Sequence, residues 1–264
     1  MEQSEREQAA ADLMAAYSSR QPIDPLINRW PDMEIEDSYA IQLLQMEEFH
    51  ARGRYTQGHK VGLTSAVVQK QIGVSQPDFG HLLDDFFHLE HLPIPSTRYI
   101  QPKIEPEIAF VLGKSLTGPG VTVAEAVAAI DYVLPALEIV DSRIVDWKIS
   151  IYDTIADNAS SGGLVLGSTP RKLTDLDLRM MGCVMHHNGK QVGTGLGGAV
   201  LGSPITSLVW LANTLGPRGV TLEAGHVVLP GSITPMVACG PGDTVTATFA
   251  GLGSVTARFD QGDN

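Results

Sequence analysis

The chain has 264 residues, of which 43% are hydrophobic and 18% are charged, and its formal net charge at pH 7 is −12. This length is sufficient to bury a sizeable core in one large domain. The acidic balance argues against nucleic acid and anionic membranes as partners, whereas a small anionic substrate can still bind where a metal ion or a buried lysine supplies positive charge.

The sequence also indicates the compartment. Its two cysteines, Cys183 and Cys239, form no disulfide framework, and a reducing compartment is the simpler interpretation. The N-terminal segment is acidic without an apolar run, and no stretch approaches the about 20 apolar residues that span a bilayer. We therefore expect a soluble, cytoplasmic protein with no membrane segment.

The N-terminal region is predicted to be helical. Residues 7–17 are rich in alanine, and residues 36–52 place apolar side chains on one broad face, followed by Gly53 as a helix stop. A short helix over residues 66–72 is expected after a cap at Thr64 or Ser65. We assign residues 1–75 to a small helical region.

From residue 92 onward the pattern becomes mainly β. Asn188-Gly189 indicates a tight hairpin, Thr122 begins a capping box for a helix to about residue 131, and Ser203-Pro204 begins a helix to residue 215. Strands are expected at 107–112, 136–140, 180–187, 190–193, 227–229, 244–249 and 254–259. Because strands and helices do not alternate regularly, we predict an α+β fold with residues 76–264 as the mainly β catalytic domain.

Three glutamates are candidate metal ligands. Glu105 and Glu107 are two residues apart on a predicted strand, so their side chains share one face. Glu138 is a single charge in an apolar segment, and a buried carboxylate needs a cationic partner. Carboxylates without nearby Cys or His favour Mg²⁺ or Mn²⁺ over Zn²⁺. The alternative for Glu105 and Glu107 is a solvated strand edge. The alternative for Glu138 is an ion pair with Arg143 or Lys148.

Lys60 and Asp78 are candidate catalytic residues. Lys60 lies between two glycines, where a substrate could approach the backbone closely. Asp78 lies in a Gln-Pro-Asp-Phe-Gly turn beside an aromatic residue. The alternative interpretations are an exposed loop lysine and an aspartate that stabilises its turn.

Several other patterns do not support a function. Residues 193–198 fit GxGxxG, but they follow a hairpin instead of opening a βαβ unit, which argues against dinucleotide binding. His186 and His187 adjoin the hairpin turn and are expected to face solvent. Ser160 has no recognisable base partner for serine-hydrolase chemistry.

Taken together, six segments resemble the 2-hydroxypenta-2,4-dienoate hydratase (2-keto-4-pentenoate hydratase) family, which belongs with the 4-oxalocrotonate decarboxylases in the fumarylacetoacetase superfamily. They run in family order along nearly the whole chain and are specific only jointly. The turn around Asp78 and the Asp146-Trp147-Lys148 segment are more similar to the hydratases, whereas Ser161 also matches some decarboxylases. The segments are 58–65, 71–82, 101–112, 134–148, 153–162 and 251–259.

The resemblance implies a fold and a site. The fold is a strongly curved, mostly β core of the fumarylacetoacetase C-terminal-domain type with flanking helices. The implied Mg²⁺ or Mn²⁺ ligands are Glu105, Glu107 and Glu138. The implied residues at the reacting carbons are Lys60 and Asp78, and those implied to bind substrate are Lys60, Leu63 and Ser160. Pro106 departs from the family pattern and indicates an edge or bulged strand at that position.

The implied function is metal-dependent addition of water to 2-hydroxypenta-2,4-dienoate in the catabolism of aromatic compounds. The resemblance also implies a homo-oligomer and a downstream aldolase as a possible partner. The first alternative is 4-oxalocrotonate decarboxylation at the same metal site, and a second, from another class, is a non-catalytic scaffolding subunit. A hydrolase of the fumarylpyruvate type is disfavoured, because the sequence offers no candidate His–Glu dyad to activate water.

Overall fold

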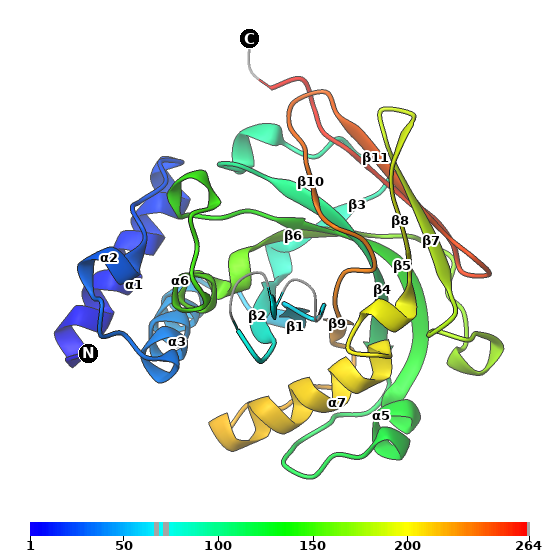
Figure 1. Ribbon diagram of the computed structural model, residues 1–264, viewed down its shortest axis with the longest axis horizontal. Coiled ribbons are helices and arrows are strands. Elements are labelled where there is room, and N and C mark those ends of the chain that lie inside the picture. The colour runs from blue at the N-terminus through cyan, green and yellow to red at the C-terminus, as the bar shows by residue number, and fades with distance from the viewer. Residues whose placement is uncertain (66–68, 71–73, 263–264) are drawn as a thin grey trace.

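The computed structural model describes residues 1–65, 69–70 and 74–262 (Figure 1). Most of the helix expected over residues 66–72 therefore lies outside the described residues. The described chain forms a helical N-terminal part, a long curved sheet in the middle of the molecule and a second sheet on the far side (Figure 1).

The N-terminal helices pack beside one end of the large sheet (Figure 1). They are α1 (Gln3–Ser19), α2 (Leu26–Arg29) and α3 (Ile35–Ala51). Helix α1 contacts α3, and both α2 and α3 contact α6 (Ile151–Ala156). A capping box at Glu34 begins α3, and Gly53, with φ of +83°, follows its end. Two buried glutamines connect α3 to α6, since Gln42 and Gln45 donate to the carbonyls of Ile155 and Ala156 at 2.9 and 2.7 Å.

The large sheet has eight strands in the order β2-β1-β9-β4-β5-β6-β3, with β10 paired to β4. Its longest pair is antiparallel β4 and β5, which are almost fully buried, as expected for strands covered on both faces. The strands are β1 (Thr56–Gly62), β2 (Asp78–Leu83), β3 (Phe87–Leu89), β4 (Lys103–Leu112), β5 (Ile130–Val140), β6 (Ser161–Leu166), β9 (Val227–Leu229) and β10 (Val237–Ala238).

The second sheet has the strand order β12-β11-β7-β8 and lies against β5. Its hairpin joins β7 (Gly182–His187) to β8 (Lys190–Leu196), and β11 (Thr244–Phe249) pairs with β12 (Gly253–Arg258). Asn188 and Gly189 both have positive φ, 49° and 76°, as a tight two-residue hairpin turn requires. The hairpin predicted from Asn188-Gly189 is therefore confirmed.

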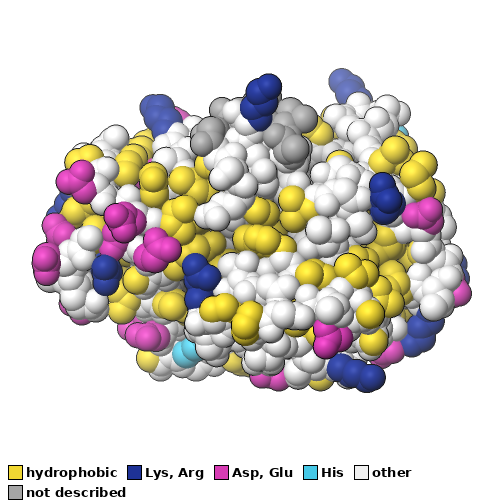
Figure 2. Space-filling model, turned by 60° about the horizontal axis from the view of Figure 1, so that its bottom comes forward, with side chains coloured by type: hydrophobic (Ala, Val, Ile, Leu, Met, Phe, Trp, Pro, Cys, Tyr) yellow, Lys and Arg dark blue, Asp and Glu magenta, His cyan; other side chains and the backbone are white. Residues whose placement is uncertain are grey.

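Helices α5 (Val123–Ala129) and α7 (Pro204–Leu215) pack against each other below the large sheet (Figure 1). Among the described residues one helical stretch, Gly197–Arg218, has the length and mean hydropathy of a membrane span. It includes α7, whose Leu208, Leu211 and Leu215 lie in the main hydrophobic core. This stretch therefore fits a core helix. On the face that α7 helps to form, charged side chains are sparse in the middle and more frequent toward the margins (Figure 2).

The predicted α+β class and the curved, mostly β core are confirmed. One segment differs from expectation. The sequence predicts a helical region to residue 75, whereas Thr56–Gly62 forms β1, which pairs with β2 and β9 inside the large sheet. Two glycines in this segment reduce its strand propensity, and neighbouring strands override that local preference.

Pro106 lies in an interior strand at a point where the neighbouring strand is interrupted. On one side β4 pairs continuously with β5, but on the other side it pairs with β10 near Ile104 and with β9 near Phe110. The Pro106 carbonyl faces this interruption and accepts from the Ile233 N–H at 3.1 Å. The missing N–H of Pro106 faces the same side, so no ladder hydrogen bond with β5 is lost. The strand is a local edge at this residue, as the sequence indicates.

Candidate metal centre and active site

The three candidate glutamates form one cluster across β4 and β5. Glu105 and Glu107 share a face of β4, and Glu105 is directly opposite Glu138 in the antiparallel register. One carboxylate oxygen from each lies within 4.8 Å of those of the other two. Glu107 and Glu138 are fully buried, and Glu105 is half-buried. The two-residue spacing on one strand therefore correctly predicts that Glu105 and Glu107 lie together, and the pairing of β4 with β5 adds Glu138.

Buried oxygens in this cluster lack donors among the described residues. Glu107 Oε2 accepts from the Gly231 N–H at 2.7 Å, but its Oε1 and both oxygens of Glu138 have no hydrogen-bond partner in the described part of the chain. Burial, followed by repulsion from Glu138, raises the pKa of Glu105 to about 7 and that of Glu107 well above its ordinary value. A cluster of carboxylate oxygens in need of positive charge fits a hard divalent cation.

Lys60 supplies positive charge to this cluster from β1. Its side chain is buried, and its Nζ lies 3.2 Å from Glu138 Oε1, in an ion pair without hydrogen-bond geometry. Burial alone would lower the pKa of Lys60, but the nearby carboxylates, chiefly Glu138 and Asp78, outweigh burial and raise it. Lys60 is therefore an ammonium in this environment and is not an exposed loop residue.

Glu138 does not pair with either cation that the sequence analysis considered as an alternative. Arg143 pairs with buried Asp157 at 2.5 Å, and Lys148 pairs with exposed Asp146 at 2.9 Å. Lys60 is thus the side chain that pairs with Glu138 among the described residues.

Asp78 begins β2 and is buried beside Lys60. Its Oδ2 accepts from Thr154 Oγ1 at 3.1 Å, and its Oδ1 has no partner among the described residues. Burial raises the pKa of Asp78, while Lys60 and the Thr154 hydroxyl oppose that rise. Gly62 lies opposite Asp78, and a Cβ at this glycine would meet Asp78 Oδ1 at 2.2 Å. The second glycine of the segment around Lys60 is therefore required by the close approach of this carboxylate.

Ser160 lies in a turn of unusual backbone conformation. Asn158, Ala159 and Ser160 have φ of 52°, 50° and 53°, so three consecutive non-glycine residues occupy the left-handed region. The Ser160 hydroxyl is buried and has no partner among the described residues. Such strain persists only where surrounding contacts impose it, and it is typical of functional sites.

A buried ion pair and an amide impose this conformation. The Arg143 guanidinium donates to Asp157 Oδ1 at 2.5 Å, to the Asp157 carbonyl at 2.7 Å and to the Ser161 carbonyl at 3.0 Å. The Asn158 amide accepts from the His81 N–H at 2.7 Å and donates to the His81 carbonyl at 2.9 Å. The turn is thereby fixed both to β2 and to the end of β5.

Leu63 follows β1 directly and also has positive φ, 55°. Its side chain is half-buried, and its carbonyl accepts from Gln69 Nε2 at 2.7 Å. Leu63 thus lies three residues from Lys60 at the end of the strand that carries that lysine.

The sequence analysis missed the supporting residues Thr154, Asp157 and Asn158. They lie in a segment that carries the family resemblance, but their partners are distant in sequence, so no local spacing identifies their roles.

The two histidines at the hairpin are half-buried, and His187 Nε2 lies 3.1 Å from Asp243. Residues 193–198 continue from a hairpin strand and open no βαβ unit, in agreement with the rejection of dinucleotide binding.

The chain belongs to the fumarylacetoacetate (FAA) hydrolase C-terminal family, whose sequence model matches residues 63–260. Within it, the chain is 48% identical over 256 residues to the 2-keto-4-pentenoate hydratase of Paraburkholderia xenovorans (strain LB400), covering 97% of this chain and 95% of the relative. It is 41% identical over 256 residues to the 2-oxo-hept-4-ene-1,7-dioate hydratase of Escherichia coli, covering 95% and 96% of the two chains. These relatives identify the chain as an enzyme and support the hydro-lyase class.

A solved structure agrees with this assignment. The 4-oxalocrotonate decarboxylase from Pseudomonas putida G7, complexed with magnesium and adipate, matches with a TM-score of 0.94 and 38% sequence identity over 98% of both chains. The sequence comparisons thus favour hydratases, whereas this structure supports the decarboxylase as an alternative.

The contact between Thr154 and Asp78 gives a testable prediction. Thr154→Val removes the hydroxyl that favours the ionised carboxylate, so the pKa of Asp78 should rise further. A pH–rate profile would measure this shift. If the acidic limb of the profile moves toward higher pH, Asp78 acts in its ionised form. If the alkaline limb moves toward higher pH, Asp78 acts in its protonated form. Thr154→Ser is the matched control and should restore the profile; unmoved limbs in Thr154→Val would contradict the role of this contact.

The Arg143–Asp157 pair gives a second prediction. Asp157→Asn leaves a buried guanidinium without its counter-charge, so the free energy of unfolding should fall by about 3–5 kcal/mol. Replacing both partners, with Arg143→Met and Asp157→Leu, should recover much of that stability in chemical denaturation. The double variant still lacks the bonds to the Asp157 and Ser161 carbonyls, so we expect its activity to remain low. A double variant with full activity would show that the pair does not position the turn.

Proposed function

We propose that this protein is a metal-dependent hydratase that converts 2-hydroxypenta-2,4-dienoate (2-oxopent-4-enoate) to 4-hydroxy-2-oxopentanoate. The observation that carries the proposal is the buried cluster of three glutamates that faces the ammonium of Lys60 beside Asp78. The hydratase relatives, which align over nearly the whole chain, support the same reaction.

Glu105, Glu107 and Glu138 would hold the cation, and their oxygen ligands favour Mg²⁺ or Mn²⁺. A divalent cation bound there supplies Lewis-acid chemistry, because it stabilises negative charge on the 2-oxygen of a 2-oxo or 2-enol acid. The oxygens of Glu107 and Glu138 that have no hydrogen-bond partner among the described residues are available as ligands for such an ion.

Lys60 and Asp78 are the proposed acid and base. Conversion of the dienol to the 2-oxo-3-enoate delivers a proton to C5 while the 2-hydroxyl loses one. Addition of water then places its hydroxyl on C4 and a proton on C3. Lys60 Nζ holds protons beside the cluster, and Asp78 Oδ1 has a free acceptor site in the same buried region. Proton transfer by positioned groups such as these contributes about 10²–10⁴-fold to a rate.

The proposed substrate-binding residues are Lys60, Leu63 and Ser160. The buried hydroxyl of Ser160, which has no partner among the described residues, can donate to the substrate carboxylate, and the left-handed turn holds it in place. We place the reaction in the catabolism of aromatic compounds in the cytoplasm. We also propose a homo-oligomeric enzyme, with an aldolase that consumes the product as a possible partner.

The alternative reaction is decarboxylation of 4-oxalocrotonate. It uses the same electron sink at the 2-oxygen, and loss of CO₂ replaces the addition of water. The close structural match to a decarboxylase supports this alternative. The presence of Lys60, Asp78 and all three glutamates argues against the third possibility, a non-catalytic scaffolding subunit.

The first test is a spectroscopic assay of freshly generated 2-hydroxypenta-2,4-dienoate mixed with the enzyme and either Mg²⁺ or EDTA. We expect metal-dependent loss of the dienol absorbance, with 4-hydroxy-2-oxopentanoate as the product. A silent assay, together with CO₂ release from 4-oxalocrotonate, would establish the decarboxylase instead. No turnover of either acid would support the scaffolding subunit.

Replacement of Glu138 tests the metal cluster. Glu138→Gln removes one anionic ligand. Loss of a residue that only supports a metal ligand typically lowers metal affinity by about 10–100-fold, so loss of the ligand itself should cost at least that much. Activity at limiting Mg²⁺ should fall in parallel. Equilibrium titration with Mn²⁺ measures the affinity independently of turnover. The matched control is Glu47→Gln on the exposed face of α3, which should change neither quantity. Wild-type Mn²⁺ affinity in Glu138→Gln would remove this residue from the metal site.

A further inference from the structure

The face of β4 that carries the glutamate cluster also carries a lysine. Lys103 precedes Glu105 by two residues on the same strand, so its side chain leaves the same face about 7 Å from Glu105 along the strand. Lys103 is half-buried. Among the described residues the lysines in ion pairs are Lys60, Lys148 and Lys172, so Lys103 has no carboxylate within pairing distance.

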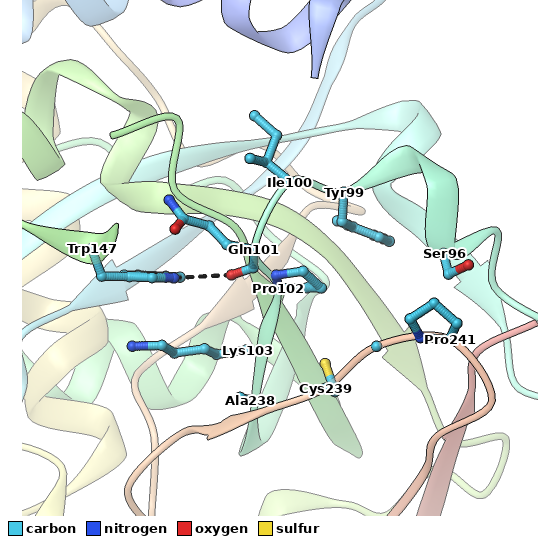
Figure 3. Close-up of a pocket in the computed structure, with 11 residues that line it drawn as sticks. Ser96, Tyr99, Ile100, Gln101, Pro102, Lys103, Trp147, Ala238, Cys239 and Pro241 are labelled. Atoms are coloured by element: carbon cyan, nitrogen blue, oxygen red, sulfur yellow. Dashed lines mark hydrogen bonds between the residues drawn. The ribbon is translucent and has the colours of Figure 1, made fainter. Parts of the chain in front are cut away.

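An indole ring holds the Lys103 ammonium. Lys103 Nζ lies 4.2 Å from the centre of the Trp147 ring, and the Trp147 indole N–H donates to the Gln101 carbonyl at 2.9 Å. Trp147 itself has positive φ, 55°, so the ring is presented from a strained turn. Figure 3 shows the lysine side chain extended beneath the ring. The indole attracts the cation without neutralising its charge.

The lysine lines a pocket that is open to solvent. The pocket has a volume of about 490 Å³, and its wall includes Tyr99, Gln101, Trp147 and Cys239 (Figure 3). No acidic side chain contributes to this wall among the described residues. The pocket thus offers an uncompensated positive charge in an otherwise neutral lining.

The sheet register relates this pocket to the Ser160 turn. Lys103 is opposite Val140 on β5, and Val140 is opposite Ser161 on β6. Lys103 and Ser160 therefore lie toward the same end of the glutamate cluster, two strand spacings apart, or about 10 Å.

The charge balance of the site calls for such a residue. When all four carboxylates of Asp78 and the glutamate cluster are ionised, the ammonium of Lys60 and a bound divalent cation leave the site with a net charge of −1. A carboxylic acid substrate would therefore be repelled unless another positive charge lies close by. Lys103 is on the cluster's own strand face.

We propose that Lys103, held by Trp147, is a carboxylate-binding residue at the rim of the glutamate cluster. This inference rests on the proposed function, because it concerns how the same site binds its acid substrate. The carboxylate has two possible sources: the group next to the 2-oxygen, or a second carboxylate at the far end of a dioic substrate.

The test measures equilibrium binding of two unreactive acids of equal length, adipate and hexanoate, by calorimetry with Mg²⁺ present. Lys103→Met keeps the length and the packing on Trp147 but removes the charge. In Lys103→Met we expect the affinity for adipate to fall about tenfold or more, which is the effect of losing one charge-assisted hydrogen bond. Lys103→Arg keeps the charge and should recover most of this affinity. If only the affinity for adipate falls, Lys103 binds the carboxylate at the far end of the ligand. If the affinities for adipate and hexanoate fall equally, Lys103 binds the carboxylate that the two ligands share.

The control is Lys148→Met, which removes an exposed lysine adjacent to Trp147 in sequence and paired with Asp146. It should leave both affinities unchanged, and melting temperatures check that each variant is folded. Unchanged affinities in Lys103→Met, or no binding of either acid to the wild-type enzyme, would overturn the proposal. Because binding is measured without turnover, a failed hydratase assay with a positive Lys103 result would reject the reaction and keep the carboxylate site.

Discussion

The buried negative charge of Glu105, Glu107 and Glu138 is the constraint on which the rest of this structure depends. Two of these side chains are fully buried, and three of their carboxylate oxygens have no donor within the residues that the structure describes. Isolated buried carboxylates are strongly unfavourable unless a cation or a proton compensates them. The fold compensates them in part with Lys60, and the remaining negative charge attracts a divalent cation.

The curved sheet meets this constraint by joining segments that are distant in the chain. β4 and β5 provide the glutamates, β1 provides Lys60 and β2 provides Asp78. The backbone N–H of Gly231, just beyond β9, fixes Glu107. Behind these side chains, Thr154 and the Arg143–Asp157 pair orient Asp78 and the Ser160 turn. The chemistry of the site thus depends on contacts from most of the chain.

Local patterns predicted much of this arrangement. The alternation of side chains on a strand placed Glu105 and Glu107 together, and the isolated charge of Glu138 indicated a buried residue. Capping and turn residues predicted α5, α7 and the Asn188-Gly189 hairpin. The resemblance to a known family assigned Lys60 and Asp78 to the reacting carbons and added Leu63 and Ser160 as substrate-binding residues.

The remaining features depend on partners far apart in sequence. Lys60 lies in a strand with poor local strand propensity, so only its pairing with β2 and β9 reveals that it is buried. The sequence offers Arg143 and Lys148 as partners of Glu138, whereas the partner in the fold is Lys60, which is distant in sequence. Thr154 and Asp157 are ordinary helix-end residues until the fold places Asp78 and Arg143 beside them.

The left-handed turn at Asn158–Ser160 has a consequence for how the enzyme gains activity during synthesis. Non-glycine residues seldom adopt this conformation in an unfolded chain, and the contacts that impose it come from β2 and from the end of β5. The turn can therefore form only after those strands have assembled around it. A nascent or partly folded chain would contain every catalytic side chain and still lack the geometry of the site, which keeps such a chain from acting on reactive dienols before folding is complete.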